Sequence, residues 1–345
     1  MSPNILTTRW MLSSKKPAFT NLLKDFSEEV SIIGEKLRTA STVLIGTHEH
    51  PDGDALGSSL ALAHVLKSQG KEVVVYIPDE PAEFFSFLPG YELLTTTKPV
   101  GQEFDAIVLL DYTQLYRTHL VDEVAQHTNV ICIDHHYDNN KEANIHLIVP
   151  KAAATAQILM SLFTLLDFPI TQDVATCLLT GIFTDTGSFM HDSVTPDILD
   201  IASLLMKKGA RLSHIAHETY QRKELPGLKI WGRALSRIFT SETPGPSVAL
   251  VTLEDLRECN ATLEDLSGVV NLLNTLPNST YAMLLVEYAP GKIKGSLRSE
   301  PHKGVDVSKI AKRLGGGGHK LASGFEVDGR IAQENGVWRI LPAST

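Results

Sequence analysis

The sequence predicts an α/β protein built from two domains, and three observations lead to this prediction. Short apolar runs alternate with helical stretches over roughly the first 200 residues, a pattern typical of βαβ units in a mainly parallel sheet flanked by helices. Aspartate and histidine residues follow several of these runs, at the points where strands would end. A turn-rich segment, 240–246, then precedes a second set of strands, which predicts a smaller C-terminal α/β domain.

The first elements form a βαβ unit. Residues 21–38 have the apolar spacing of an amphipathic helix, and 41–46 is a short β-rich run. The stretch 55–68 is predicted as the next helix, closed by the glycine at position 70, and 71–78 as the next strand. The motif that begins at position 48 therefore follows a strand.

Two further apolar runs, 104–110 and 129–133, end at Asp111 and Asp134. In open parallel sheets, ligands collect outside the carboxyl ends of the strands, so we expect these loops to converge with the loop that follows the first strand. Helices are predicted over 152–166 and 173–183, before Asp185, and over much of 196–239. Beyond the turn-rich segment, strands are predicted at 247–253, 280–290 and 292–299, and a helix at 306–314.

These elements suggest where the domains begin and end. The chain has 345 residues and is 43% hydrophobic, which suits two domains that each have a core. We expect residues 20–205 to form the first domain, 206–245 a helical linker and 246–345 the second domain.

Charge and composition narrow the range of partners. The net charge of −9 argues against an extended basic track for long nucleic acids, whereas one local cluster of cations could still hold a short or small anionic substrate. No segment approaches the roughly 18 apolar residues of a membrane span, and no secretory h-region is present. The three cysteines are widely spaced, without a disulfide or zinc pattern. We therefore expect a cytoplasmic protein without a membrane partner.

The acidic and histidine motifs suit divalent metal ions. His48 is followed by Asp52 and Asp54 in a Pro-Asp-Gly-Asp segment, where a tight turn would let both carboxylates face one pocket; a solvated turn is the alternative. Asp134-His135-His136 follows a buried-looking strand, where a metal would supply partners for imidazole and carboxylate; a surface turn is the alternative. With Asp111 and Asp185, this ligand set suits two divalent ions that share a bridging carboxylate, so phosphoester hydrolysis is the first hypothesis.

Anion-binding features occur near the C-terminus. Four glycines at 315–318 precede His319, and successive glycine N–H groups can form an anion-binding concavity. Arg298 ends a predicted strand and could offer a bidentate fork to a phosphate. A glycine turn and a solvated arginine are the alternatives. Arg117 could reach a phosphate or pair with a surface carboxylate.

Taken together and in order, these motifs resemble the DHH phosphoesterase superfamily, in the branch with a C-terminal DHHA1 domain. The resemblance covers roughly residues 40–330. The resemblance depends on six motifs: His48-x-x-Pro-Asp-Gly-Asp-Ala-x-Gly-Ser58, Asp111, Asp134-His135-His136, Thr184-Asp-Thr-Gly187, Ser296-Leu-Arg-Ser299 and Gly316-Gly-Gly-His319-x-x-Ala-Ser-Gly324.

The resemblance implies a site in the cleft between the domains and a set of metal ligands. One Mn²⁺ would be held by His48, Asp52 and Asp111, and a second by Asp54, Asp111, His135 and Asp185, with Mg²⁺ or Co²⁺ as substitutes. Asp111 would bridge the two ions.

The same resemblance implies roles for other residues. Asp134 would orient a histidine, and His136 would lie near the scissile phosphate. The other phosphate or the terminal nucleotide of the substrate would be held by Arg298, Gly316, Gly317, Gly318 and His319. After Phe189 the chain has Met190-His191, where the family often has a basic residue, and His191 is the residue that could substitute for it in a phosphate contact.

Compact bacterial members of this branch degrade very short oligoribonucleotides, of about 2–5 nucleotides, and dephosphorylate pAp (3′-phosphoadenosine 5′-phosphate), through a hydroxide that bridges two metal ions. The resemblance implies the same activity here, with a homodimer also compatible with the family. A phosphodiesterase for cyclic dinucleotides or their linear products is the alternative enzyme. An exonuclease for long strands is disfavoured by the net negative charge of the chain. A pyrophosphatase of the superfamily is disfavoured because such enzymes have a second domain of another type, without the Gly-Gly-Gly-His pattern. A non-catalytic nucleotide-binding scaffold is disfavoured because Asp or His occupies every expected metal position.

Overall fold

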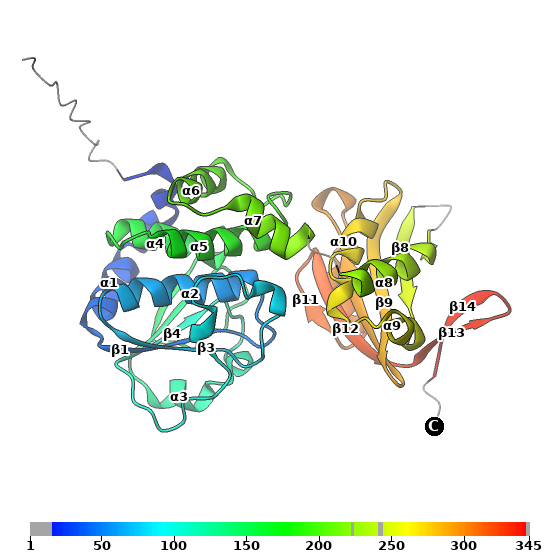
Figure 1. Cartoon of the computed structure of the whole chain (residues 1–345), viewed down its shortest axis with the longest axis horizontal. Coiled ribbons are helices and arrows are strands. Elements are labelled where there is room, and N and C mark those ends of the chain that lie inside the picture. Colours follow the sequence, from blue (N-terminus) through cyan, green and yellow to red (C-terminus); the bar gives the residue numbers. More distant parts are fainter. Residues whose placement is uncertain (1–15, 222–223, 241–243, 343–345) are drawn as a thin grey trace, which may run out of the picture. The chain divides into compact units, whose positions relative to one another are not determined.

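The structure is a computed structural model that describes residues 16–221, 224–240 and 244–342. The chain divides into two compact units, one that ends at Gln221 and one that begins at Arg222 (Figure 1). Within the described ranges, no helix is both long and apolar enough to cross a membrane.

The first unit contains a parallel six-stranded sheet in the order β3-β2-β1-β4-β5-β6. Its strands are β1 (Thr42–Gly46), β2 (Glu72–Tyr76), β3 (Leu94–Thr95), β4 (Ala106–Leu110), β5 (Val130–Asp134) and β6 (Ile145–Ile148). Its α-helices are α1 (Ser27–Thr39), α2 (Gly53–Ser68), α3 (Val121–Gln126), α4 (Thr155–Leu165), α5 (Gln172–Asp185), α6 (Pro196–Lys207) and α7 (Leu212–Ala216). Short 3₁₀ segments cover Ala18–Phe26, Glu83–Phe85, Tyr91–Leu93 and Leu115–Thr118, and a π-helical turn covers His217–Gln221.

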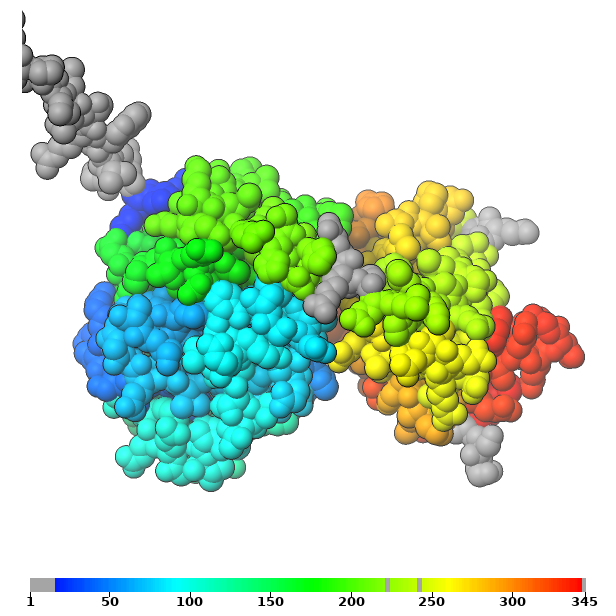
Figure 2. Space-filling model, viewed as in Figure 1, coloured from blue at the N-terminus to red at the C-terminus, as the bar shows by residue number. Residues whose placement is uncertain are grey.

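Helices cover both faces of this sheet. Side chains alternate between the faces along each buried strand, so each strand contributes to two cores. In β4, Val108 and Leu110 belong to the larger core, beneath α1, α2, α4, α5 and α6, whereas Ile107 and Leu109 belong to a smaller core beneath α3. Figure 1 shows α3 on the side of the sheet opposite α2, α4 and α5. In the space-filling view of Figure 2, the blue to green segments of this unit form a continuous surface. Burial on both faces explains the uninterrupted apolar runs in the sequence.

The sheet order brings the predicted site loops together. The central strands β1, β4 and β5 are adjacent and parallel, with Val43 opposite Ala106 and Val108 opposite Ile131. Their carboxyl ends therefore meet at one edge of the sheet, and the loops that follow them leave side by side.

The second unit contains a mixed six-stranded sheet in the order β11-β12-β10-β9-β8-β7 and a separate β13-β14 hairpin. Its strands are β7 (Ile238–Phe239), β8 (Gly245–Val251), β9 (Ser279–Ala289), β10 (Lys292–Arg298), β11 (Gly317–Gly318), β12 (Ala322–Asp328), β13 (Arg330–Glu334) and β14 (Val337–Leu341). Its α-helices are α8 (Leu225–Ser236), α9 (Leu253–Cys259), α10 (Val269–Asn274) and α11 (Val307–Arg313), with 3₁₀ segments at Glu264–Leu266 and Pro301–Lys303. One core packs α8, α9 and α10 on the sheet, and a second packs α11 on its other face.

The predicted fold class, a parallel α/β domain followed by a smaller α/β domain, is confirmed. The segment 206–245, predicted as a helical linker, divides: α7 packs in the first unit, whereas α8 packs in the core of the second. The predicted limits at 205 and 246 therefore lie inside the two units rather than between them. The position of the active site between the domains stays a prediction.

Candidate metal centre

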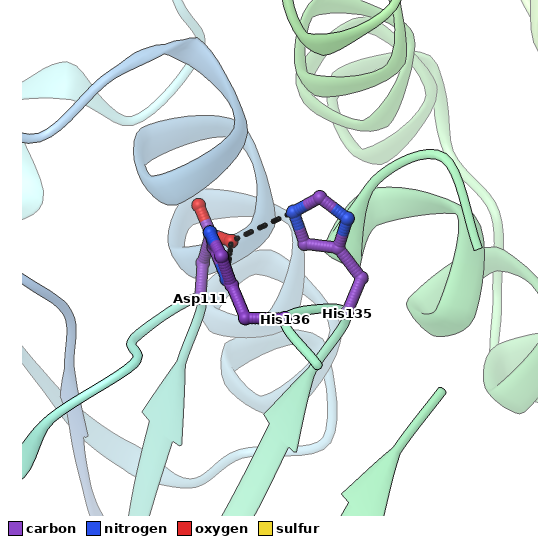
Figure 3. A group of neighbouring side chains, drawn as sticks. All are labelled: Asp111, His135 and His136. Atoms are coloured by element: carbon purple, nitrogen blue, oxygen red, sulfur yellow. Dashed lines mark ion pairs between the residues drawn. The ribbon is translucent and has the colours of Figure 1, made fainter. Parts of the chain in front are cut away.

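Asp111 is the central carboxylate of the candidate site. It follows β4 with a φ of 56°, a left-handed conformation that aspartate tolerates better than most residues, and its side chain is 2% exposed. Its Oδ2 lies 3.9 Å from His48 Nε2, and its Oδ1 lies 3.6 Å from His135 Nε2 and 3.7 Å from His136 Nδ1. Figure 3 shows Asp111 beside the rings of His135 and His136 at the ends of their strands. The two oxygens of one buried carboxylate thus face different histidines.

The orientation of His48 and His135 suits metal binding. His48 Nδ1 lies 2.6 Å from the Glu49 carbonyl oxygen, and His135 Nδ1 lies 3.4 Å from the Ala152 carbonyl oxygen. A carbonyl oxygen only accepts hydrogen bonds, so in the neutral ring each Nδ1 carries the hydrogen and each Nε2 presents a lone pair. Both lone pairs point toward a carboxylate, an arrangement that a cation between them would stabilise.

Asp52 and Asp54 stand at the start of α2 but in different environments. Asp52 is exposed and caps the helix, since its Oδ1 accepts from Asp54 N at 2.9 Å and from Ala55 N at 3.0 Å. Asp54 is 1% exposed. Gly53 is required between them, because a Cβ there would lie 2.4 Å from Thr184 Oγ1. The predicted turn is therefore the first turn of a helix.

Three groups of donor atoms could hold a metal ion, and within each group all atoms lie within 4.8 Å of one another. The groups are His48 with Asp52 and Asp111; Asp54 with His135 and Asp185; and Asp111 with His135 and His136. The structure thus brings all six predicted ligands to one edge of the sheet. Their roles as ligands stay predictions.

The carboxylates of this site repel one another. Burial and the nearby Asp111 raise the pKa of Asp54 to about 8. Burial, followed by Asp54 and Asp52, holds the pKa of Asp185 well above its ordinary value, although its side chain is 28% exposed. Burial and Asp52 likewise raise the pKa of Asp111. Divalent cations would relieve this accumulated negative charge, so the donor set fits them.

Asp134 organises the motif that follows β5. It is fully buried, and its Oδ1 accepts from His135 N and His136 Nδ1, both at 2.8 Å. Its Oδ2 accepts from Asn139 Nδ2 at 2.9 Å. Asn139 also donates to the carbonyl oxygen of Tyr112, the residue after Asp111, and so joins the loops that follow β4 and β5.

Two residues of this site were not anticipated from the sequence. Asn139 is one, and Thr155, which contacts both Asp54 and Asp111, is the other. Each is a common polar residue in a loop or at a helix start, and no motif in a single sequence marks it.

In the second unit, β12 brings Arg298 and the glycine-rich segment together. Arg298 pairs with Ala322 in the sheet register, and His319 N donates to the Ala322 carbonyl oxygen at 2.7 Å. Burial lowers the pKa of the Arg298 guanidinium, which donates to the Leu297 carbonyl oxygen and pairs with no carboxylate of the described chain. Such a cation is suited to an external anion.

The glycine-rich segment is an edge strand. Gly317 and Gly318 pair with β12, and Gly316 N donates to the Ala311 carbonyl oxygen at 2.9 Å. A Cβ on Gly316 would lie 2.1 Å from the Gly324 carbonyl oxygen, so glycine is required there for close packing. The N–H groups of Gly316 and His319 thus already have backbone acceptors, and anion binding by the segment stays a prediction.

Two open questions from the sequence concern Arg117 and His191. Arg117 Nε lies 3.3 Å from Glu49 Oε1, so it pairs with a carboxylate. His191 Nδ1 lies 3.1 Å from the Asp185 carbonyl oxygen, which places its ring beside a predicted ligand.

Comparisons with known proteins identify the family. Residues 42–182 match the DHH family, N-terminal domain, and residues 245–337 match the DHHA1 domain. A protein of Thermus thermophilus named bifunctional oligoribonuclease and PAP phosphatase NrnA is 33% identical over 303 residues, 88% of this chain and 89% of the relative. The chain belongs to the DHH family. It carries that family's DHHA1 domain as well, as the motifs predicted.

Other relatives agree with this assignment. An exopolyphosphatase-related protein from Bacteroides fragilis has a solved structure with a TM-score of 0.82 and 27% identity, covering 92% of this chain and 93% of that one. A probable manganese-dependent inorganic pyrophosphatase from Enterococcus faecalis is 23% identical over 170 residues, 48% of this chain and 54% of the relative. Family membership and the donor clusters together make this chain a metal-dependent phosphoesterase.

Proposed function

We propose that this DHH-family protein is a Mn²⁺-dependent hydrolase that converts short oligoribonucleotides, of about 2–5 nucleotides, to mononucleotides and pAp to AMP. The observation that carries the proposal is that two donor clusters, one with His48 and one with His135, lie at the same edge of the parallel sheet. The Asp111 carboxylate faces both histidines. The printed name of the Thermus thermophilus relative supports this choice of substrates.

Two divalent ions would be held by the predicted ligands. His48, Asp52 and Asp111 would hold one, and Asp54, Asp111, His135 and Asp185 the other. Bound ions would supply an activated water and would neutralise charge on the phosphate during an in-line displacement.

His136 is the residue proposed to contact the scissile phosphate. Its Nδ1 is fixed by the buried Asp134 carboxylate at 2.8 Å, which sets the ring orientation. Burial disfavours the imidazolium, but the hydrogen bond to Asp134 and the charge of Asp111 outweigh it and raise the pKa of His136. A protonated His136 would donate to a phosphate oxygen.

Arg298 and the segment Gly316–His319 are proposed to bind the substrate's remaining phosphate or its terminal nucleotide. The support is the half-buried Arg298 guanidinium, which has no carboxylate partner in the described chain and lies on β10, next to the strand β12 with which Gly317 and Gly318 pair. A short substrate is favoured by the net charge of −9, which offers a long strand little attraction.

The test is a comparison of catalytic efficiencies. Purified full-length protein is incubated with Mn²⁺ and pAp, a dinucleotide, an RNA of about five nucleotides, a DNA of about 20 nucleotides and a cyclic dinucleotide, with a chelated sample as the control. The proposal predicts hydrolysis of pAp and the short RNAs that chelation abolishes. Faster turnover of the cyclic dinucleotide would reassign the protein to the alternative phosphodiesterase, and equal digestion of the long strand would reject the length limit.

A further inference from the structure

The first residue of α4 contacts two carboxylates, one in the first turn of α2 and one in the loop that follows β4. Thr155 N donates to Asp54 Oδ2 at 2.6 Å, and the Thr155 hydroxyl donates to Asp111 Oδ1 at 3.1 Å. The next backbone N–H, from Ala156, donates to Asp54 Oδ1 at 2.9 Å. Thr155 itself is fully buried.

The position of Thr155 in the helix explains this use of its hydroxyl. Inside a helix, a threonine hydroxyl commonly donates to the carbonyl oxygen four residues earlier. Thr164 in α4 does so, with Oγ1 at 2.9 Å from the Met160 carbonyl oxygen, and Thr180 in α5 bonds Thr176 in the same way. Thr155 begins its helix, where no preceding turn offers that carbonyl, and its hydroxyl is directed to Asp111 instead.

We propose that Thr155 is a positioning residue that sets the orientation of the Asp111 carboxylate between the two metal ions; the proposal rests on the two-ion site described above. The hydroxyl holds Oδ1 on the side of His135, at 3.6 Å from Nε2, and Oδ2 is thereby left on the side of His48. Rotation of the carboxylate would turn one oxygen away from the histidine that would hold an ion with it. The backbone N–H of Thr155 also donates to Asp54, so the start of α4 fixes the positions of both carboxylates.

The hydroxyl can be removed while the backbone contact is kept. Thr155→Val preserves the shape of the side chain and the N–H that bonds Asp54 but removes the donor to Asp111. Thr155→Ser keeps the donor and removes only a methyl group. Thr164→Val is the matched control, because it makes the same change in the same helix at a hydroxyl that bonds only the Met160 carbonyl oxygen.

The experiment measures Mn²⁺ binding to the chelator-treated full-length variants by calorimetry, together with kcat and KM on a dinucleotide. Loss of an outer hydrogen bond to a metal ligand typically lowers metal affinity or activity about 10–100-fold. Thr155→Val should therefore bind one ion or both about 10–100-fold more weakly and lose kcat with little change in KM, whereas Thr155→Ser and Thr164→Val stay near the wild-type values.

Two results would overturn the proposal. Wild-type Mn²⁺ affinity in Thr155→Val would mean that the hydroxyl does not position Asp111. Equal weakening in Thr155→Val and Thr155→Ser would mean that packing matters rather than the hydrogen bond. If Thr155→Val fails to fold without metal, Thr155→Ala takes its place and is compared with Thr155→Ser on the same criteria.

The binding measurement also separates this proposal from the proposed function. A wild-type protein that binds two ions but does not hydrolyse the dinucleotide would reject the substrate assignment, and the affinities of the Thr155 variants would still test the positioning role. A wild-type protein that binds fewer than two ions would reject both.

Discussion

Replacing Asp111 with asparagine should abolish activity and at the same time stabilise the metal-free protein. The change keeps the size of the side chain and an oxygen that can accept from the Thr155 hydroxyl, but it removes a buried negative charge. That charge is needed when cations are bound and is unfavourable when they are absent, because burial and Asp52 raise the pKa of the Asp111 carboxyl.

The expected magnitudes follow from these contacts. A carboxylate that contacts both ions contributes several kcal/mol to catalysis, and a loss of about 4–5 kcal/mol lowers kcat by three to four orders of magnitude. Because burial and Asp52 raise the pKa of the Asp111 carboxyl, removal of the charge should raise the free energy of unfolding of the metal-free protein near pH 8.

The assays are dinucleotide hydrolysis with Mn²⁺ and urea unfolding in excess chelator. Asp105→Asn is the matched control, because Asp105 precedes the same strand at its opposite end and accepts from Ser41 N and Thr42 N. Those hydrogen bonds lower the pKa of Asp105, so its replacement should weaken stability slightly and leave kcat unchanged. An Asp111→Asn variant that is less stable than the metal-free wild type, or that keeps kcat within about tenfold, would refute the reasoning.

Three further predictions concern protons, phosphate binding and the Asp134 network. Burial and Asp111 raise the pKa of Asp54 to about 8, so Mn²⁺ binding should release protons near pH 6 and fewer near pH 9, measured by calorimetry in buffers of different ionisation enthalpy. Between about pH 4 and about pH 8 the folded metal-free protein keeps a proton on Asp54 that the unfolded chain has lost, so its stability should fall as the pH rises across this range; a rise would contradict this assignment. Arg298→Ala should raise KM for pAp about tenfold or more with a smaller effect on kcat, and an unchanged KM would exclude Arg298 from substrate binding. Asn139→Leu should lower kcat about 10–100-fold by releasing Asp134 and His136, while wild-type kcat would show that Asn139 is structural only.

The parallel sheet could be predicted because its strands are buried on both faces. The runs that became β1, β4 and β5 are continuously apolar and end in polar residues, a pattern that a parallel sheet with covered faces produces. Strand β6, Ile145–Ile148, was not predicted, because it is a partly exposed edge strand in which His146 interrupts the apolar pattern.

The candidate ligands could be predicted from the position of their residues after strands, but the contacts that hold them could not. Hydrogen bonds such as Thr155 to Asp111 join residues 44 positions apart, and this pairing depends on how α4 packs against the sheet. The pairing of Gly317 and Gly318 with β12 could not be predicted from the sequence either, because a run of glycines has no pattern typical of a strand.

Crystallography of the protein soaked in Mn²⁺, with data collected at the manganese absorption edge, tests the central claim most directly. The account predicts two anomalous peaks per chain, one among His48, Asp52 and Asp111 and the other among Asp54, His135 and Asp185, with Asp111 in contact with both. A single peak, or two peaks of which neither lies against Asp111, would contradict it.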